Sequence, residues 1–101
     1  MARVVWTTPA LKDAEAIRDY IARDSPRYAR LVTERIVAAT ARLADFPQSG
    51  RMVPELRQPA LREVIVGRYR VVYRMVAEEV QVAAVVHGAR RFPTGDFEAP
   101  P

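Results

Sequence analysis

The stretch LREVIVGRYRVVYRMVAEEVQVAAVVH, residues 61–87, decides the fold of this chain. It contains three runs rich in β-branched and aromatic residues, at 61–66, 69–76 and 80–87. Only Gly67-Arg68 and Ala77-Glu78-Glu79 separate the runs. Connections this short join antiparallel strands, because a parallel crossover needs about a dozen residues or more. The sequence therefore predicts a three-stranded antiparallel meander.

Two amphipathic helices are predicted ahead of the meander. Thr8 resembles an N-cap with Pro9 at the first helical position, and apolar residues then recur at helical spacing, which predicts a helix over residues 9–23. Ser25 followed by Pro26 repeats this arrangement and opens a second helix, which should end at Phe46-Pro47. The stripe of the first helix is Ala10, Ala14, Ile17 and Ile21, widened by Leu11 and Tyr20; that of the second is Ala29, Val32, Ile36, Ala39, Leu43 and Phe46. Their short connection predicts an antiparallel helical hairpin.

The order of elements predicts an α+β domain. A short strand at residues 4–6 precedes the helices and should add to the sheet, while residues 47–59 read as a connector over the surface. The order β-α-α-β-β-β implies a helical hairpin packed on one face of a small antiparallel sheet, with the other face open. Residues 1–92 should form a single domain, and residues 93–101 a loose C-terminal tail.

Composition limits the classes of function. The chain has 101 residues, a net charge of +4 and a single lysine, Lys12, so its basic side chains are nearly all arginine. Such a surface attracts nucleic acid or an acidic protein segment. The absence of cysteine and the presence of one histidine exclude thiolate and multi-histidine metal sites. No apolar run reaches the ~20 residues of a membrane span, and we expect a cytoplasmic protein without a cofactor.

The alternation within the middle strand separates its side chains into two faces. Tyr69, Val71, Tyr73 and Met75 should point toward the helices, and Arg70 and Arg74 toward the open face. Arg70 either forms a cross-strand ion pair with Glu63 or has a functional role, whereas Arg74 lies near Glu78 and Glu79 of the next turn.

The last strand ends at a cluster of polar residues. Strict alternation places Val80, Val82, Ala84 and Val86 on one face and Gln81, Ala83, Val85 and His87 on the other. A solitary His87 is either an acid or base near neutral pH or, more commonly, a ring satisfied by neighbouring backbone. Gly88 lets the chain turn, so that Arg90, followed by Arg91, should approach Arg70. Arginines that converge in this way repel one another unless an anion or acidic partner binds.

Several motifs resemble the RelE/ParE superfamily of type II toxin-antitoxin toxins. The likeness extends over residues 4–92 and rests above all on LREVIVGRYRVVYRM and VQVAAVVHGARRF, while IRDYIARDSP and HGARR look most like the ParE branch. The resemblance implies a toxin that inhibits DNA gyrase, acts in plasmid stabilisation and is held in a hetero-oligomer by a ParD-like antitoxin. Under this reading no catalysis is needed, and the candidates for binding the target or the antitoxin are Arg70, Arg74, His87, Arg90 and Arg91.

The RelE branch provides the alternative, a ribosome-dependent mRNA endonuclease. Carried over to this chain, its catalytic set would comprise Arg70, Arg90, His87 and Tyr73, with Arg70 and Arg90 at phosphate-contacting positions. The tail PTGDFEAPP holds no tyrosine or histidine, and LREVIV holds no lysine, so the proton-transfer set is incomplete. This favours gyrase as the target over RNA cleavage on the ribosome. A third reading is a non-toxic relative that only binds a partner.

Overall fold

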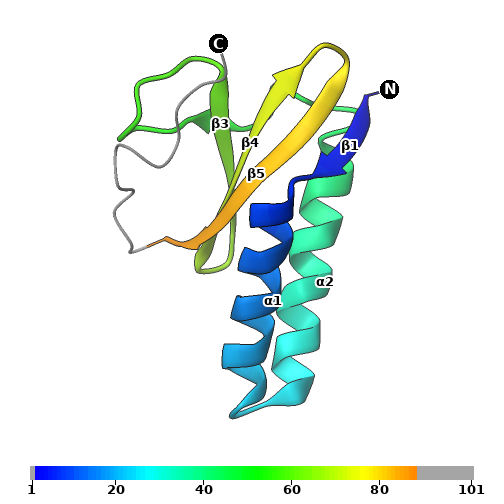
Figure 1. Cartoon of the computed structure of the whole chain (residues 1–101), viewed down its shortest axis with the longest axis vertical. Coiled ribbons are helices and arrows are strands. Elements are labelled where there is room, and N and C mark those ends of the chain that lie inside the picture. Colours follow the sequence, from blue (N-terminus) through cyan, green and yellow to red (C-terminus); the bar gives the residue numbers. More distant parts are fainter. Residues whose placement is uncertain (1, 89–101) are drawn as a thin grey trace.

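The computed structural model describes residues 2–88, which form two helices and a five-stranded sheet. The elements follow in the order β1 (Arg3–Trp6), α1 (Thr8–Ala22), α2 (Pro26–Arg42), β2 (Arg51–Met52), β3 (Leu61–Val66), β4 (Tyr69–Val76) and β5 (Glu79–His87) (Figure 1). The predicted α+β class and the helical hairpin on one face of the sheet are confirmed.

The sheet is mixed, with strand order β1-β5-β4-β3-β2. The predicted meander of β3, β4 and β5 is antiparallel throughout, whereas β1 joins the edge of β5 in parallel, with Val4 opposite Val80. The expectation of a purely antiparallel sheet is therefore wrong at β1. Because the helical hairpin follows β1, the chain has the long crossover that a parallel neighbour requires.

A β-bulge in β5 changes the predicted faces of that strand. Val72 pairs with Ala84 and Tyr73 pairs with Val82, so Ala83 is an extra residue between them. Val82 and Val85 therefore pack in the same cluster, and Ala84 packs on the opposite face. Strict alternation predicted Val82 and Ala84 on the same face of β5. This prediction is wrong, because the extra residue Ala83 puts them on opposite faces.

The caps of the two helices largely follow the sequence signals. In α1 the N-cap is Thr7 rather than Thr8; its hydroxyl oxygen accepts the N–H of Ala10 at 3.3 Å and donates to the carbonyl of Val82 at 3.0 Å. In α2 the predicted cap, Ser25, accepts the N–H of Tyr28. This helix ends at Arg42, before the predicted stop at Phe46-Pro47.

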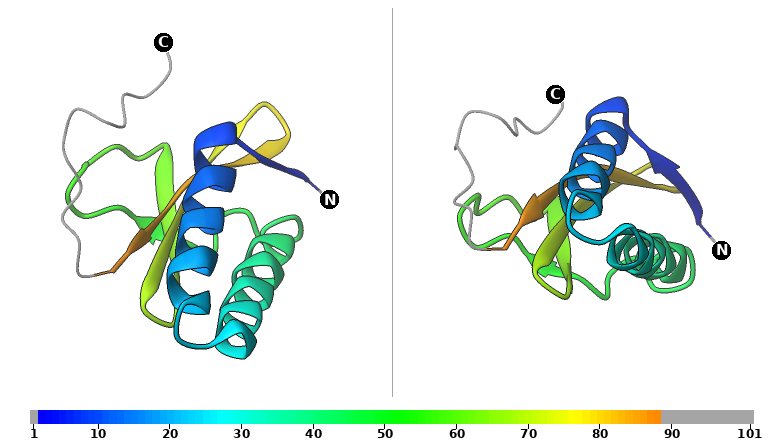
Figure 2. Two further views of the ribbon diagram at one scale, coloured as in Figure 1. Left: turned by 60° about the horizontal axis from the view of Figure 1, so that its bottom comes forward. Right: turned by 90° about the horizontal axis from the view of Figure 1, so that it is seen from below.

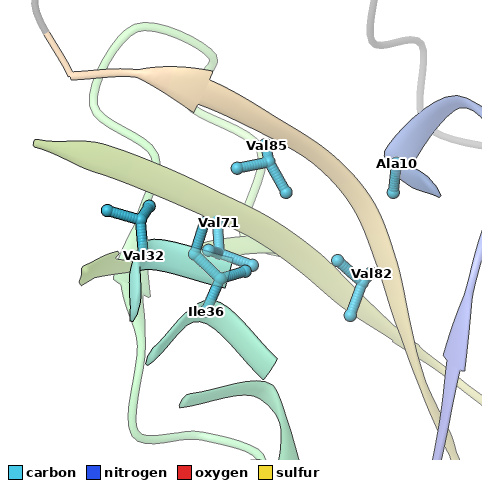
Figure 3. Packing of buried hydrophobic residues seen from close by; sticks show 6 residues of the cluster. All are labelled: Ala10, Val32, Ile36, Val71, Val82 and Val85. Atoms are coloured by element: carbon cyan, nitrogen blue, oxygen red, sulfur yellow. The ribbon is translucent and has the colours of Figure 1, made fainter. Parts of the chain in front are cut away.

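The helical hairpin covers one face of the sheet, as the two views of Figure 2 show. Between the layers lies a cluster of buried residues from both helices and the two central strands (Figure 3), made up of Ala10, Val32, Ile36, Val71, Val82 and Val85. Ile17 and Ile21 pack against it, while Leu11 and Tyr20 of the predicted stripe are exposed. At the other end Tyr73, Leu43 and Val80 form a second cluster, which confirms that Tyr73 faces the helices.

The second face of the sheet is not open as predicted. Val53 and Leu56, from the segment between β2 and β3, pack on Val72 and Ala84 and form a separate buried cluster with Leu61. The reason is hydrophobic: Val72 is fully buried, and a two-residue β2 followed by a folded segment supplies its cover. Arg70 lies on this covered face.

Candidate functional site

Arg70 is buried beneath the segment that follows β2, with an exposed fraction of 6%. Its Nε donates to Glu63 Oε1 at 2.7 Å, and its Nη2 lies 2.6 Å from the same oxygen. Its Nη1 donates to Glu55 Oε2 at 2.5 Å and its Nη2 to Glu55 Oε1 at 2.7 Å. Of the two readings of Arg70, the ion pair with Glu63 is therefore present, and Glu55 is a second partner.

Arg51 completes a four-membered ion cluster that we call the arginine-glutamate cluster: Arg51, Glu55, Glu63 and Arg70. Arg51 Nε and Nη2 each lie 2.7 Å from Glu63 Oε2. Two cations and two anions leave the cluster without net charge. The hydrogen bonds to Glu55 are the largest cause that raises the pKa of Arg70 above its ordinary value. The arginine thus stays charged and fully engaged with protein carboxylates.

Strand register explains how the sequence assembles this cluster. Arg51 of β2 is directly opposite Glu63 of β3, and Ile65, two residues after Glu63, is directly opposite Arg70 of β4. Alternation therefore places Arg51, Glu63 and Arg70 on one face of three adjacent strands. Glu55 arrives from the covering segment. Because the Glu63 side chain is fully buried, its charge requires both arginines.

His87 and Tyr69 meet at the far end of the sheet. They are register partners on β5 and β4, and their rings stand edge to face, with centroids 5.6 Å apart. His87 is exposed, and burial is the main cause that raises the pKa of the Tyr69 hydroxyl. The contact is of the kind that stabilises strand ends.

Tyr73, a member of the alternative catalytic set, is fully buried. Its hydroxyl donates to the carbonyl of Pro47 at 2.8 Å and accepts the N–H of Gly50 at 2.8 Å. Burial raises the pKa of this hydroxyl above its ordinary value. Both hydrogen-bonding roles of Tyr73 are thus used to fix the segment before β2.

Arg74 and the C-terminal arginines complete the list of predicted site residues. Arg74 Nε donates to Gln81 Oε1 at 3.1 Å, and within residues 2–88 it forms no ion pair with its expected partners Glu78 and Glu79. Arg90 and Arg91 lie outside the described residues, so the approach of Arg90 to Arg70 stays a prediction.

Two of the hollows in the described structure lie on either side of α2. One, of about 620 Å³, lies in the helical hairpin and is lined by Arg18 and Ala22 of α1 and by Arg30, Thr33 and Val37 of α2. The other, of about 450 Å³, lies between the C-terminal half of α2 and the edge of β3. Within residues 2–88, no cluster of histidine and acidic side chains could hold a metal ion, and neither helix is long and apolar enough to cross a membrane.

Comparison with known proteins identifies the family. The model described as the ParE toxin of the type II toxin-antitoxin system, parDE, matches residues 4–92. The chain belongs to the ParE toxin family. It is thus a toxin of the type II toxin-antitoxin class, as its resemblance to the RelE/ParE superfamily implied.

The similar proteins include toxins named after the RelE branch and toxins named after the ParE branch. The chain is 41% identical over 91 residues to toxin RelE2 of Caulobacter vibrioides, covering 89% of this chain and 99% of that protein. It is 33% identical over 89 residues to toxin ParE3 of the same organism, covering 87% and 88%. A solved structure described as the chromosomal ParDE TA system from P. aeruginosa matches with a TM-score of 0.73 and 23% identity, covering 86% and 96%, and supports the fold.

Glu55 and Arg51 are the site residues that sequence reasoning missed. Both lie in the proline-rich stretch PQSGRMVPELRQP, which has no sustained period and was interpreted as a surface connector. The available signal was Glu63 in the middle of a β-branched strand, because a buried carboxylate needs partners. A buried carboxylate indicates that a cationic side chain lies nearby, but it does not identify which residue supplies that side chain.

Proposed function

We propose that this chain inhibits DNA gyrase and that a ParD-like antitoxin neutralises it within a hetero-oligomer. In this proposal the chain acts by binding rather than by cutting RNA. Membership of the ParE family supports gyrase as the target. The arginine-glutamate cluster is the main observation against RNA cleavage.

Arg70 occupies the position that resembles a phosphate-contacting arginine of the ribonuclease branch. Here Glu55 and Glu63 receive its Nε, Nη1 and Nη2 groups at 2.5 to 2.7 Å. A phosphate would have to displace Glu55, which would lose both of its hydrogen bonds to the guanidinium, or Glu63, whose fully buried carboxylate would keep only Arg51 as a partner. Arg70 therefore acts as a structural cation in this proposal.

The proton-transfer groups support the same reading. The Tyr73 hydroxyl is buried and bonded to two backbone groups, so it is not placed to take a proton from a 2′-hydroxyl. His87 is exposed at a strand end, next to Tyr69. RNA cleavage would thus depend on His87 without the second group that such chemistry requires.

The decisive experiment combines purified chain with gyrase and supercoiled DNA. We expect loss of supercoiling activity and accumulation of cleaved DNA as the chain is titrated in. The Arg90→Ala variant should weaken this inhibition, while Arg3→Ala, at an exposed arginine of the edge strand β1, serves as the matched control. Unchanged supercoiling at high concentrations of folded chain would contradict the proposal.

A second experiment separates the two targets in cells. Expression without an antitoxin should induce the DNA damage response while translated messages stay intact in primer extension. Cuts within codons, with replication unaffected, would instead establish the ribonuclease. Growth without any effect would support the non-toxic relative.

A further inference from the structure

Tyr28, in the first turn of α2, stands between two hollows at the end of the sheet nearer the α1–α2 connection (Figure 1). On one side it lines a small hollow of about 30 Å³ together with Tyr69 and the β3–β4 turn. On the other side it lines a wider hollow of about 480 Å³ on the surface of α2. Because Tyr28 belongs to both hollows and is 49% exposed, its side chain separates them and stays open to a partner.

Two more tyrosines lie near Tyr28. Burial is the main cause that raises the pKa of Tyr69, and the nearby hydroxyls of Tyr28 and Tyr20 raise this pKa further. The three phenol groups therefore lie close to one another, although they come from α1, α2 and β4. Tyr20 is 69% exposed, and Tyr69 is half-buried. We call Tyr20, Tyr28 and Tyr69 the tyrosine cluster.

The requirements of the fold do not account for the two exposed rings. Within residues 2–88 the side chains of Tyr20 and Tyr28 form no hydrogen bond, whereas Tyr73 is fully buried and uses its hydroxyl twice. An exposed tyrosine offers a flat apolar face and a polar tip, which makes it a common residue of binding surfaces. The rings of Tyr20 and Tyr28 are thus available to a partner.

The surface around Tyr28 is basic. Four arginines line its two hollows, and all are exposed: Arg27 and Arg30 in the wider one, Arg35 and Arg68 in the smaller. None of the four forms an ion pair with another of residues 2–88. Glu34 is the one carboxylate among the described lining residues of the two hollows. Neighbouring arginines without counter-charges attract an anionic partner.

We propose that the tyrosine cluster binds single-stranded DNA, with bases stacked on Tyr20 and Tyr28 and phosphates held by the flanking arginines. Proteins that bind single strands without reading their sequence combine a basic surface with aromatic rings on which successive bases stack. In a duplex the bases stack on one another and only their edges are open, so these rings would add little to duplex binding. The choice of DNA over RNA rests on the proposed function, in which the chain acts on gyrase and its DNA.

The probe is a short fluorescein-labelled oligothymidylate, and fluorescence anisotropy reports its binding to the purified chain. Tyr20→Leu and Tyr28→Leu keep an apolar side chain and remove the ring, so each should weaken binding by roughly tenfold. Tyr28→Phe keeps the ring and should bind normally. Phe46→Leu is the matched control, because it removes an exposed ring beyond the other end of α2. Thermal unfolding establishes that each variant is folded.

The salt dependence of binding tests the arginines. For a single strand, each phosphate contact contributes about 0.7 to the slope of log Kd against log salt concentration. Arg27→Gln and Arg68→Gln, one from each hollow, should each lower the slope by about this amount. Arg3→Gln, on the edge strand β1, should leave the slope unchanged.

Four results would each overturn the proposal. One is equal binding of the oligothymidylate by the Tyr20→Leu, Tyr28→Leu and Phe46→Leu variants, and another is no binding at low salt. The third is tighter binding of a duplex or of an oligouridylate. The fourth is tighter binding of a glutamate-rich peptide than of the oligothymidylate, which would assign the surface to a protein.

The gyrase assay separates this proposal from the proposed function. A chain that binds the oligothymidylate through Tyr20 and Tyr28 but leaves supercoiling unchanged would contradict gyrase as the target and support the DNA-binding surface. A chain that inhibits gyrase without binding the oligothymidylate would support the proposed function and overturn the DNA-binding surface.

Discussion

Glu55 receives both terminal nitrogens of Arg70, and this pair fastens the segment after β2 to the central strand of the sheet. Glu55 belongs to a segment that also contacts the sheet through the apolar side chains of Val53 and Leu56 and through the N–H of Val53, which donates to the carbonyl of Leu61 at 3.4 Å. The same contact neutralises the arginine that resembles a phosphate ligand. One ion pair therefore affects both the fold and the chemistry of this face.

Removing charges from the arginine-glutamate cluster should destabilise the chain to different extents. Glu63→Gln leaves Arg70 and Arg51 without their shared buried anion and should cost about 3 kcal/mol in the free energy of unfolding. Glu55→Gln should cost less, about 1 to 2 kcal/mol, because 27% of this side chain is exposed and Glu63 remains. Urea denaturation measures both values.

Glu79→Gln is the matched control for these two substitutions. Its ion pair with Arg3 is long, at 3.8 Å, and lies on the surface. Such pairs contribute about 0 to 1 kcal/mol, so little change is expected. A Glu63→Gln variant as stable as Glu79→Gln would show that the cluster does not stabilise the fold.

Ala77 is a position where a substitution should stabilise the protein. It occupies the turn between β4 and β5 with φ of 54°, in the left-handed region that costs a residue with Cβ about 1 to 2 kcal/mol. Ala77→Gly removes this cost and loses about 0.5 to 1 kcal/mol of chain entropy, for a net gain of about 0.5 kcal/mol. We expect Tm to rise by a few degrees.

Ala38→Gly provides the opposite case for comparison. This alanine lies inside α2, where glycine costs about 1 kcal/mol, and its Tm should fall. If Ala77→Gly lowered Tm as Ala38→Gly does, the turn would not hold the strain that its φ indicates.

The sequence predicted the parts of the fold that depend on local pattern. The meander follows from Gly67-Arg68 and the second short turn, and the cap of α2 follows from Ser25 before Pro26. The parallel pairing of β1 and the bulge at Ala83 were missed. Both arise from how separate segments pack, and a four-residue strand carries no signal of its direction.

For the site, the ion pair of Arg70 with Glu63 was one of the two roles that the sequence predicted for Arg70. Strand alternation alone is enough to bring these two residues near each other. Glu55 had no such signal, since its contact with Arg70 depends on how the segment after β2 folds back over the sheet.

Stability should decline at alkaline pH because of the buried Tyr73 and the half-buried Tyr69. Burial raises the pKa of Tyr73 and of Tyr69 above the ordinary value of about 10. The unfolded chain therefore releases these protons first, and the stabilisation, complete below about pH 10, is lost as pH rises through the folded-state pKa. Urea midpoints measured from about pH 8 to about pH 11 should fall.

Tyr73→Phe tests the origin of this alkaline decline. The variant should lose about 1 to 2 kcal/mol at neutral pH, because the N–H of Gly50 and the carbonyl of Pro47 lose their partner. Its stability should then fall less steeply above pH 10 than that of the parent chain. Parallel curves for the two proteins would exclude Tyr73 as a source of the pH dependence.

His87→Ala should leave the toxic activity in place. The ring is exposed and its described contact is edge-to-face packing on Tyr69, so its removal should cost about 1 kcal/mol of stability at most. If the chain inhibits gyrase without transferring protons, cells that express His87→Ala should give the same colony counts after induction as cells that express the parent chain. The same result is expected for His87→Gln. A folded His87→Ala that loses toxicity by about a hundredfold or more would contradict this prediction, and the loss of cuts within codons in the same variant would indicate acid-base catalysis and favour the ribonuclease.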